Sequence, residues 1–308
     1  MKRNLFFVFF SLVFSTIVSA QIRYTVIPET PRPGEPVTIG VSSSDATDGV
    51  KEALLFVNGR QLAKSAFFSV PAEAWKPGFL AAVITVPSTA NPGSATIKVN
   101  GETDLIMEIP ITISSRDFVS EVIELDPVLT GIRVDPDPKK TEEANRLWGI
   151  LSTNGSKIYH TGFFVPPLES TRRTSFFGDR RVFKYSNGAN DMSIHAGVDF
   201  GVPKGTRVSA CANGKVVLAR MRIVTGNSVV IEHAPGIYSL YYHLDSIIVK
   251  EGDIVYTGMQ IGFSGSTGLS TGPHLHWEIR VSTENTDPDS FLNRPIIDKE
   301  TIISKIYH

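Results

Sequence analysis

The chain has little cysteine, no excess of charge of either sign and no long apolar run beyond its N-terminus. Cys211 is the single cysteine among 308 residues, so no intramolecular disulfide can form and stability must come from a packed core. The surrounding TRVSACANGKVV is rich in small and β-branched residues, which favours a buried, inert thiol over a catalytic one. The net charge of −1 gives no indication of binding to nucleic acid or to an anionic membrane.

The first 20 residues have the pattern of a secretory signal peptide. Lys2 and Arg3 precede an apolar run from Leu5 to Val18, and the small Ala20 closes the segment. This run is shorter than the about 20 residues that a membrane-spanning helix needs, which favours cleavage after Ala20 over an uncleaved anchor. We therefore expect an exported protein, periplasmic or extracellular, with no membrane span after residues 1–20 are removed.

The remainder predicts an all-β protein of two domains joined by a connector. Residues 21–115 hold short β-branched runs between turn residues, as in an immunoglobulin-like β-sandwich. In the connector, residues 116–167, the segment TEEANRLWGIL is acidic early and apolar at helical spacing, which predicts a short helix packed between the domains. Strands return in residues 168–296 without the long helices of a βαβ sheet, and residues 297–308 are left as a C-terminal tail. The first domain carries no catalytic motif and is a candidate site for a protein partner.

Two histidines stand two residues apart in TGPHLHWEIRV near the C-terminal end. Side chains alternate between the faces of a β-strand, so His274 and His276 are expected on one face together with Glu278 and Arg280. The opposite face is apolar and is expected to be buried; it consists of Leu275, Trp277, Ile279 and Val281. The two imidazoles are therefore held side by side, which indicates a metal site or a reaction, although such pairs also occur as coincidental strand residues.

The block SIHAGVDF supplies two further ligand types, His195 and Asp199. Their even spacing places both on one face of an extended segment. A catalytic zinc site uses three nitrogen or oxygen ligands and leaves one position for water. His195, Asp199 and one member of the His274/His276 pair would complete such a set, and the pattern leaves open which member it is.

A fifth candidate is His243 in YSLYYHL. Strand alternation places it with Ser239 and Tyr241, on the face opposite Tyr242. A histidine at the end of such a strand either serves the site or satisfies a backbone group, and His233 in VVIEH fits the second role better. The helical His-Glu-x-x-His motif is absent from the sequence, which excludes the thermolysin type of zinc site. The His-x-His pair also lacks the glutamate several residues beyond it that a cupin site would need.

These blocks, in the order SFFGDRR, HAGVDFGVPKG, GNSVVIEH, YSLYYHLDS and GPHLHWEI, resemble the lysostaphin-type zinc metallo-endopeptidases, which cut peptidoglycan peptides. The resemblance covers residues 170–292 in order and spacing. It implies an antiparallel β catalytic domain with a groove over a Zn²⁺ ion. It further implies that the metal ligands are His195, Asp199 and His276, and that the catalytic histidines are His243 and His274.

The implied function is zinc-dependent hydrolysis of amide bonds in the peptide cross-links or stems of bacterial peptidoglycan. The alternative is a non-catalytic wall-binding or amidase-activating module on the same fold. Degenerate members of the family lose metal ligands, whereas this chain keeps all five site residues. Two questions stay open: which peptide bond is cut, and whether the connector or its LSTNGSK loop covers the groove and makes the full chain latent.

Overall fold

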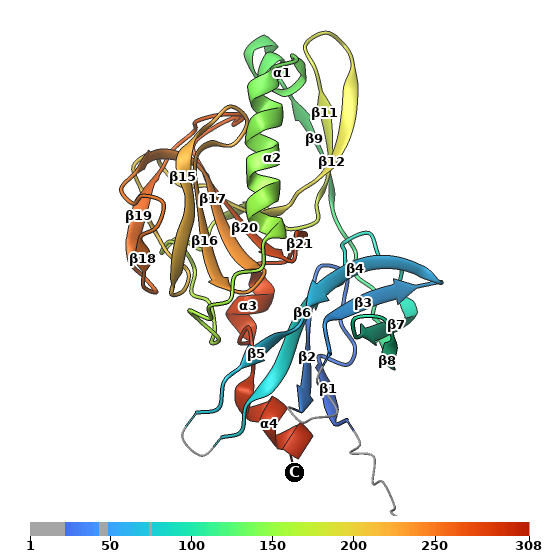
Figure 1. Cartoon of the computed structure of the whole chain (residues 1–308). Coiled ribbons are helices and arrows are strands. Elements are labelled where there is room, and N and C mark those ends of the chain that lie inside the picture. The colour runs from blue at the N-terminus through green and yellow to red at the C-terminus, as the bar shows by residue number, and fades with distance from the viewer. Residues whose placement is uncertain (1–21, 43–48, 74–75, 308) are drawn as a thin grey trace, which may run out of the picture.

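The computed structural model describes residues 22–42, 49–73 and 76–307, so the predicted signal peptide lies outside the described residues. Two four-stranded antiparallel sheets form the first domain (Figure 1). One sheet has the order β1 (Tyr24–Ile27), β2 (Pro36–Ser42), β6 (Phe79–Thr85), β5 (Phe68–Val70). The other has the order β4 (Arg60–Ala66), β3 (Glu52–Val57), β7 (Gly93–Asn100), β8 (Leu105–Ile113). Alternate residues of both sheets, among them Ile39, Leu55 and Ile97, share one core. This confirms a β-rich first domain, while its immunoglobulin-like topology stays a prediction.

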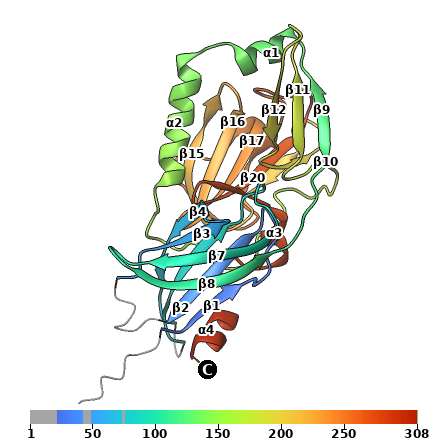
Figure 2. The same cartoon turned by 90° about the vertical axis from the view of Figure 1, so that its right-hand side faces the viewer.

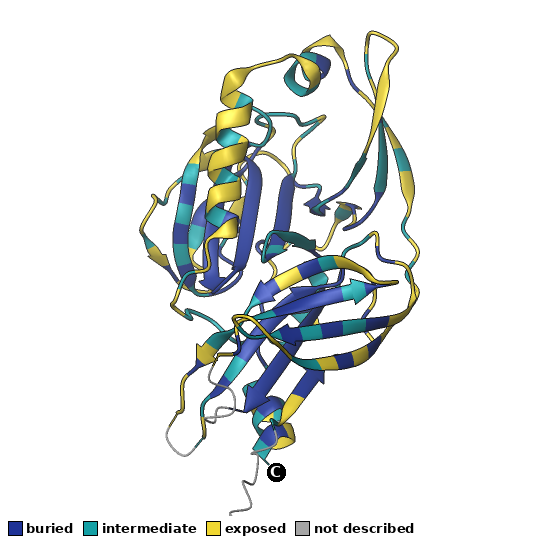
Figure 3. Ribbon diagram, turned by 45° about the vertical axis from the view of Figure 1, so that its right-hand side comes forward, coloured by how far each residue is buried: buried dark blue, intermediate teal, exposed yellow. Residues whose placement is uncertain are grey.

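The second domain is built on a ten-stranded antiparallel sheet, called the large sheet. Its main path is β10 (Arg173–Ser175), β13 (Gly197–Phe200), β20 (Leu275–Val281), β17 (Ile237–Ile247), β16 (Gly226–Ala234), β15 (Gly214–Arg222) and β18 (Ile254–Val255). The remaining strands are β14 (Arg207–Ser209), β19 (Gln260–Ser264) and β21 (Glu284–Thr286). Its long central strands are almost wholly buried (Figure 3). The predicted antiparallel β architecture of this domain is confirmed.

A separate three-stranded sheet, called the arm sheet, stands beside the large sheet (Figure 2). Its strands are β12 (Asn190–Ile194), β11 (Arg180–Lys184) and β9 (Ser120–Glu124). β9 comes from the connector and pairs parallel to β11 of the second domain. The connector therefore forms part of the second domain's structure.

Two helices follow β9 in the connector, α1 (Pro127–Val134) and α2 (Pro138–Ser152). Asp137 caps α2 by accepting a hydrogen bond from the Lys139 amide, as expected at a helix start. Leu151 packs with Leu218 and Val230 of the large sheet. The predicted helix is therefore present, but it covers the large sheet instead of filling the space between the domains. None of the described helices is long and apolar enough to cross a membrane.

The expected tail contains a packed helix, α4 (Lys299–Tyr307), which follows the short helix α3 (Asp289–Asn293). Ile302 and Ile306 of α4 are fully buried in a cluster that also holds Phe79 of β6 and Trp277 of β20. The helix approaches so closely that a Cβ on Gly40 would lie 2.5 Å from a side-chain atom of Ile302. The C-terminus thus joins the two domains through one continuous apolar core.

Candidate metal centre and active site

Strand pairing brings two of the predicted ligands together. β13 and β20 are antiparallel, and Asp199 stands directly opposite His276. The other face of β20 is buried as predicted, since Leu275, Trp277 and Ile279 are 0% exposed. Because the apolar face fixes the register of a half-buried strand, His276 has to face Asp199. His195 comes from the segment just before β13, where its amide donates a hydrogen bond to the Asp179 carbonyl 2.9 Å away.

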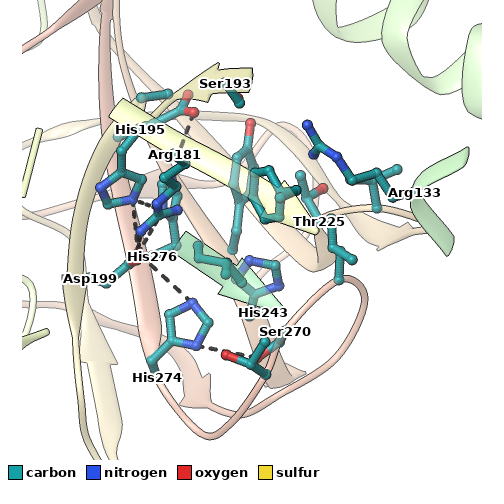
Figure 4. Close-up of a pocket in the computed structure, with 18 of the residues that line it drawn as sticks. Arg133, Arg181, Ser193, His195, Asp199, Thr225, His243, Ser270, His274 and His276 are labelled. Carbon is teal, nitrogen blue, oxygen red and sulfur yellow. Dashed lines mark hydrogen bonds and ion pairs between the residues drawn. The ribbon is translucent and has the colours of Figure 1, made fainter. Parts of the chain in front are cut away.

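The three predicted ligands converge on one point (Figure 4). Asp199 Oδ1 lies 2.8 Å from His276 Nδ1 and 3.1 Å from His195 Nε2. The two nitrogens are 3.0 Å apart. A triangle of this size allows one ion to lie about 2.0–2.2 Å from all three atoms, the range of zinc bonds to nitrogen and oxygen. Two imidazoles and one carboxylate also form a donor set that zinc prefers, so the residues present fit this metal.

Each of the three side chains has an outer partner that orients it. His195 Nδ1 donates to the Phe176 carbonyl at 2.8 Å, which leaves Nε2 as a lone-pair donor. His276 Nε2 lies 3.5 Å from the Glu278 carboxylate, which leaves Nδ1 for the metal. Asp199 Oδ2 accepts a hydrogen bond from Arg181 Nη2 at 2.7 Å, which leaves Oδ1 available to a metal. Such outer partners set the tautomer and direction of metal ligands.

Burial and charge act in opposite directions on these groups. Burial by itself raises the pKa of Asp199, but hydrogen bonds from His195 and His276 outweigh it and hold this pKa well below the usual value. Burial by itself lowers the pKa of His276, yet Asp199 and Glu278 raise it to about 9. The site therefore concentrates negative charge around two imidazoles, which favours a cation at their centre.

His274 and His243 stand beside the three predicted ligands without joining their cluster. His274 Nδ1 donates to the Gly272 carbonyl at 2.8 Å, and its Nε2 lies 3.8 Å from Asp199 Oδ1. His243 Nδ1 donates to the Thr267 carbonyl at 2.7 Å. Their ring centroids are 4.8 Å apart. Both rings thus carry the hydrogen on Nδ1, which leaves an Nε2 lone pair free to accept a proton.

Burial keeps these two histidines neutral. It lowers the pKa of His243 to about 3, with a further contribution from His274. It also lowers the pKa of His274, although the Asp199 charge opposes this. Neutral imidazoles are the form in which histidine acts as a general base.

The alternation predicted along β17 is wrong at His243. Tyr242 and His243 both line the pocket, whereas Tyr241 is fully buried in the core. Asn227 pairs with Leu244 and Val229 with Tyr241, so two residues of β17 oppose one of β16, which is a β-bulge. His243 has a φ of +59°, a conformation that costs free energy for a residue with a side chain and is enriched at functional sites.

The pocket that contains these residues has a volume of about 230 Å³. One wall comes from the connector, through Ile123 and Leu125 of the β9 region and Arg133 of α1. The LSTNGSK loop is not among the lining residues; its Asn154 borders a different cleft, beside Lys64 of the first domain. The connector thus lines the pocket through β9 and α1, while the sequence had left open whether the connector covers the groove.

Sequence reasoning also missed Arg181 and the role of Glu278. Glu278 carries a usable signal, because it lies two residues after His276 on the same face of a strand. Arg181 lies in the block SFFGDRR, but nothing in that block indicates a contact with Asp199, which is 18 residues away in sequence and in a different sheet. The position of Arg181 depends on how the arm sheet packs beside the large sheet.

The remaining candidates lie away from the pocket. Cys211 is fully buried, and burial raises the pKa of its thiol to about 12, so the expected inert thiol is confirmed. His233 is also fully buried, with hydrogen bonds to the Asn213 carbonyl and to Ser239. Both residues contribute to the core instead of the chemistry.

Residues 193–288 match the family model for peptidase family M23. The chain is 40% identical over 129 residues to the DD-carboxypeptidase/endopeptidase Mpg of Neisseria meningitidis serogroup B, a match that covers 42% of this chain and 29% of that protein. It is 38% identical over 170 residues to the peptidoglycan DD-endopeptidase ShyA of Vibrio cholerae, which covers 55% of this chain and 39% of that protein.

A Pseudomonas aeruginosa crystal structure, described as a candidate M23 peptidase, has a TM-score of 0.59 and 24% identity over 85% of this chain and 94% of that chain. It supports the two-domain fold. The chain spans less than half the length of the two curated relatives. Residues 193–288, which carry all five site residues predicted from the sequence, therefore form a domain of peptidase family M23.

Proposed function

We propose that this chain is a zinc-dependent endopeptidase that hydrolyses amide bonds in the peptides of bacterial peptidoglycan. The observation that carries the proposal is the cluster of His195 Nε2, Asp199 Oδ1 and His276 Nδ1, all within 4.8 Å of one another, in a pocket that also holds His243 and His274. A binding module needs no such combination of three ligands and two neutral imidazoles. The enzyme is therefore favoured over the non-catalytic alternative.

His195, Asp199 and His276 would hold the metal. When bound, zinc supplies Lewis-acid chemistry that polarises a peptide carbonyl and makes water more acidic. His274 Nε2 faces the Asp199 carboxylate at 3.8 Å, so it is placed to take a proton from a water at the site and to return it to the leaving amine. His243 stands beside it and also presents an Nε2 lone pair, because its Nδ1 hydrogen is bonded to the Thr267 carbonyl, so it is placed to accept a proton in the same exchange.

The walls of the pocket fit an extended peptide. Ile123, Leu125 and Phe183 offer apolar surface to the pocket, and Ser270 and Thr225 offer hydroxyl groups. Apolar walls with a few directed polar groups are typical of pockets that bind and orient a ligand. The names of the relatives, which include DD-endopeptidases, support peptidoglycan peptides as the substrate class.

The same relatives support a location in the cell envelope. We propose export through cleavage after Ala20, which would give a periplasmic or extracellular enzyme whose mature N-terminus is Gln21. The first domain, residues 21–115, remains available for a protein partner.

The test is incubation of the purified chain with isolated peptidoglycan, with added Zn²⁺ and, in parallel, with a chelator. Mass spectrometry of the released fragments identifies the bond that is cut. Zinc-dependent release of peptides supports the proposal. A chain that binds peptidoglycan yet releases nothing under any metal condition would favour the non-catalytic module.

A further inference from the structure

Arg181 lies between the Asp199 carboxylate and a second carboxylate that comes from the connector. Its Nη2 donates to Asp199 Oδ2 at 2.7 Å, and its Nε donates to Glu121 Oε1 at 2.5 Å. The Arg181 side chain is 15% exposed and that of Glu121 31%, whereas that of Asp199 is 8% exposed, so the inner ion pair is well shielded from water and the outer pair is partly shielded. Asp199, Arg181 and Glu121 thus form a line of alternating charge that ends at the proposed metal ligand.

Backbone pairing fixes the position of Glu121. On the parallel pair β9 and β11, Glu121 is the direct partner of Arg181, and directly opposite residues of neighbouring strands point to the same side. Ser175 Oγ completes the arrangement, 3.0 Å from Glu121 Oε1 and 2.7 Å from Arg181 Nη2. Glu121 and Arg181 both precede residues 193–288, the range of the family match.

We infer that Glu121 is a positioning residue of the metal centre, which acts through Arg181 on Asp199; the inference rests on the zinc site proposed above. An arginine beside a dication is repelled unless another negative charge balances it. Glu121 supplies that charge and holds the guanidinium in the plane from which it binds Asp199 Oδ2. Asp199 Oδ1 is then left facing His195 and His276.

The consequence is that the connector helps to build the metal centre. Without the Glu121 charge, Arg181 loses one of its two ion pairs and is free to turn away from a bound metal, and Asp199 loses its fixed direction. Outer partners of metal ligands typically contribute about 10–100-fold to metal affinity. Arg181 contacts Asp199 directly, whereas Glu121 contacts it only through Arg181. We therefore expect Glu121→Gln to weaken zinc binding about tenfold and Arg181→Met to weaken it more.

The experiment measures the zinc dissociation constant of the full chain by competition with a chromophoric chelator. Glu124→Gln is the matched control, because it removes the same charge from the same strand. The Glu124 side chain is 81% exposed and 3.7 Å from Lys184, so its charge is screened by solvent. Wild type and Glu124→Gln should bind zinc equally, and Glu121→Asp, which keeps the charge, should lie between wild type and Glu121→Gln.

A double variant tests the route of the effect. If Glu121 acts only through Arg181, adding Glu121→Gln to Arg181→Met should change zinc affinity by no more than about twofold, because coupled residues are not additive. Thermal unfolding of the metal-free proteins separates an effect of Glu121 on zinc binding from a purely structural role. A structural role would lower Tm and leave the zinc affinity of the folded variants unchanged. If Glu121→Gln does not fold, Ser175→Ala replaces it, since Ser175 contacts both side chains.

The inference is overturned if Glu121→Gln binds zinc as tightly as Glu124→Gln, or if the two losses multiply in the double variant. If wild type itself binds no zinc, the proposed metal site fails instead, which is a different result.

Discussion

Replacing His274 by alanine tests the proposed division of roles between His274, which would move a proton, and His276, which would bind the metal. None of the atoms of His274 belongs to the three-atom cluster of His195, Asp199 and His276, and His274 Nε2 is 3.8 Å from Asp199 Oδ1. The variant therefore keeps every proposed metal-ligating atom. Zinc content should stay close to one per chain, because only a neighbour of the ligand set is lost.

Turnover should fall steeply in the same variant. A general acid–base group contributes about 10²–10⁴-fold to rate, which corresponds to about 2.7–5.5 kcal/mol of barrier. The His274 side chain is 17% exposed and its hydrogen bond is to the nearby Gly272 carbonyl. Its removal should therefore cost little folding stability, and the loss of rate is expected to reflect chemistry.

The assay pairs elemental analysis with the rate of peptide release from peptidoglycan. His160→Ala is the matched control, since the His160 side chain is hydrogen-bonded to the Phe163 carbonyl in the connector region and does not line the pocket, so both readouts should stay unchanged. Ser270→Ala is a milder test, because His274 Nδ1 keeps its bond to Gly272 when the 3.2 Å contact to Ser270 is lost. A His274→Ala protein that has lost its zinc would refute this division of roles. Full activity in that protein would refute a catalytic role for His274.

Four further outcomes are expected. His276→Ala and Asp199→Ala should each lose most of the bound zinc in the same elemental analysis, because one of three ligands is gone; retention of stoichiometric metal by either would contradict the ligand set. Ile302→Ala should destabilise the folded state by about 2–5 kcal/mol, the usual cost of emptying a buried site, and denaturant unfolding at a fixed zinc concentration measures this; an unchanged midpoint would contradict the packing of α4. Cys211 should react with a thiol reagent only after unfolding, because it is fully buried and burial raises its pKa to about 12; rapid labelling of the native protein would contradict its place in the core. The mature exported protein should begin at Gln21 by intact-mass measurement, and a mature form that starts at Met1 would argue against cleavage.

Short-range spacing in the sequence predicted much of the candidate site. The alternation in HLHWEIRV depends only on the two-residue period of a strand, so it correctly separated His274 and His276 from the buried Leu275 and Trp277. The four-residue spacing of His195 and Asp199 is similarly local. Resemblance to a family then selected His276 from the pair, a choice that spacing alone left open.

Local pattern failed where the backbone departed from regular geometry. His243 lies beside Tyr242 in the pocket because a bulge and a φ of +59° reverse the alternation of side chains. No residue type in YSLYYHL indicates that a bulge forms there. The expected tail became a packed helix because the first domain presents a surface to it: Gly40 of β2 leaves room for Ile302, and Ile302 and Ile306 join Phe79 of β6 in one apolar cluster. That surface arises only when the first domain has folded.

Only the tertiary structure decided what surrounds the metal centre. Glu121 is 60 residues from Arg181 and 78 residues from Asp199 in sequence, yet parallel pairing of β9 with β11 places all three in one line of charge. No periodicity can predict such a contact, because it depends on which strand edges meet after the connector folds back. The sequence and its family resemblance selected the side chains that are proposed to hold a metal and move a proton. The fold decided which neighbours hold those side chains in place.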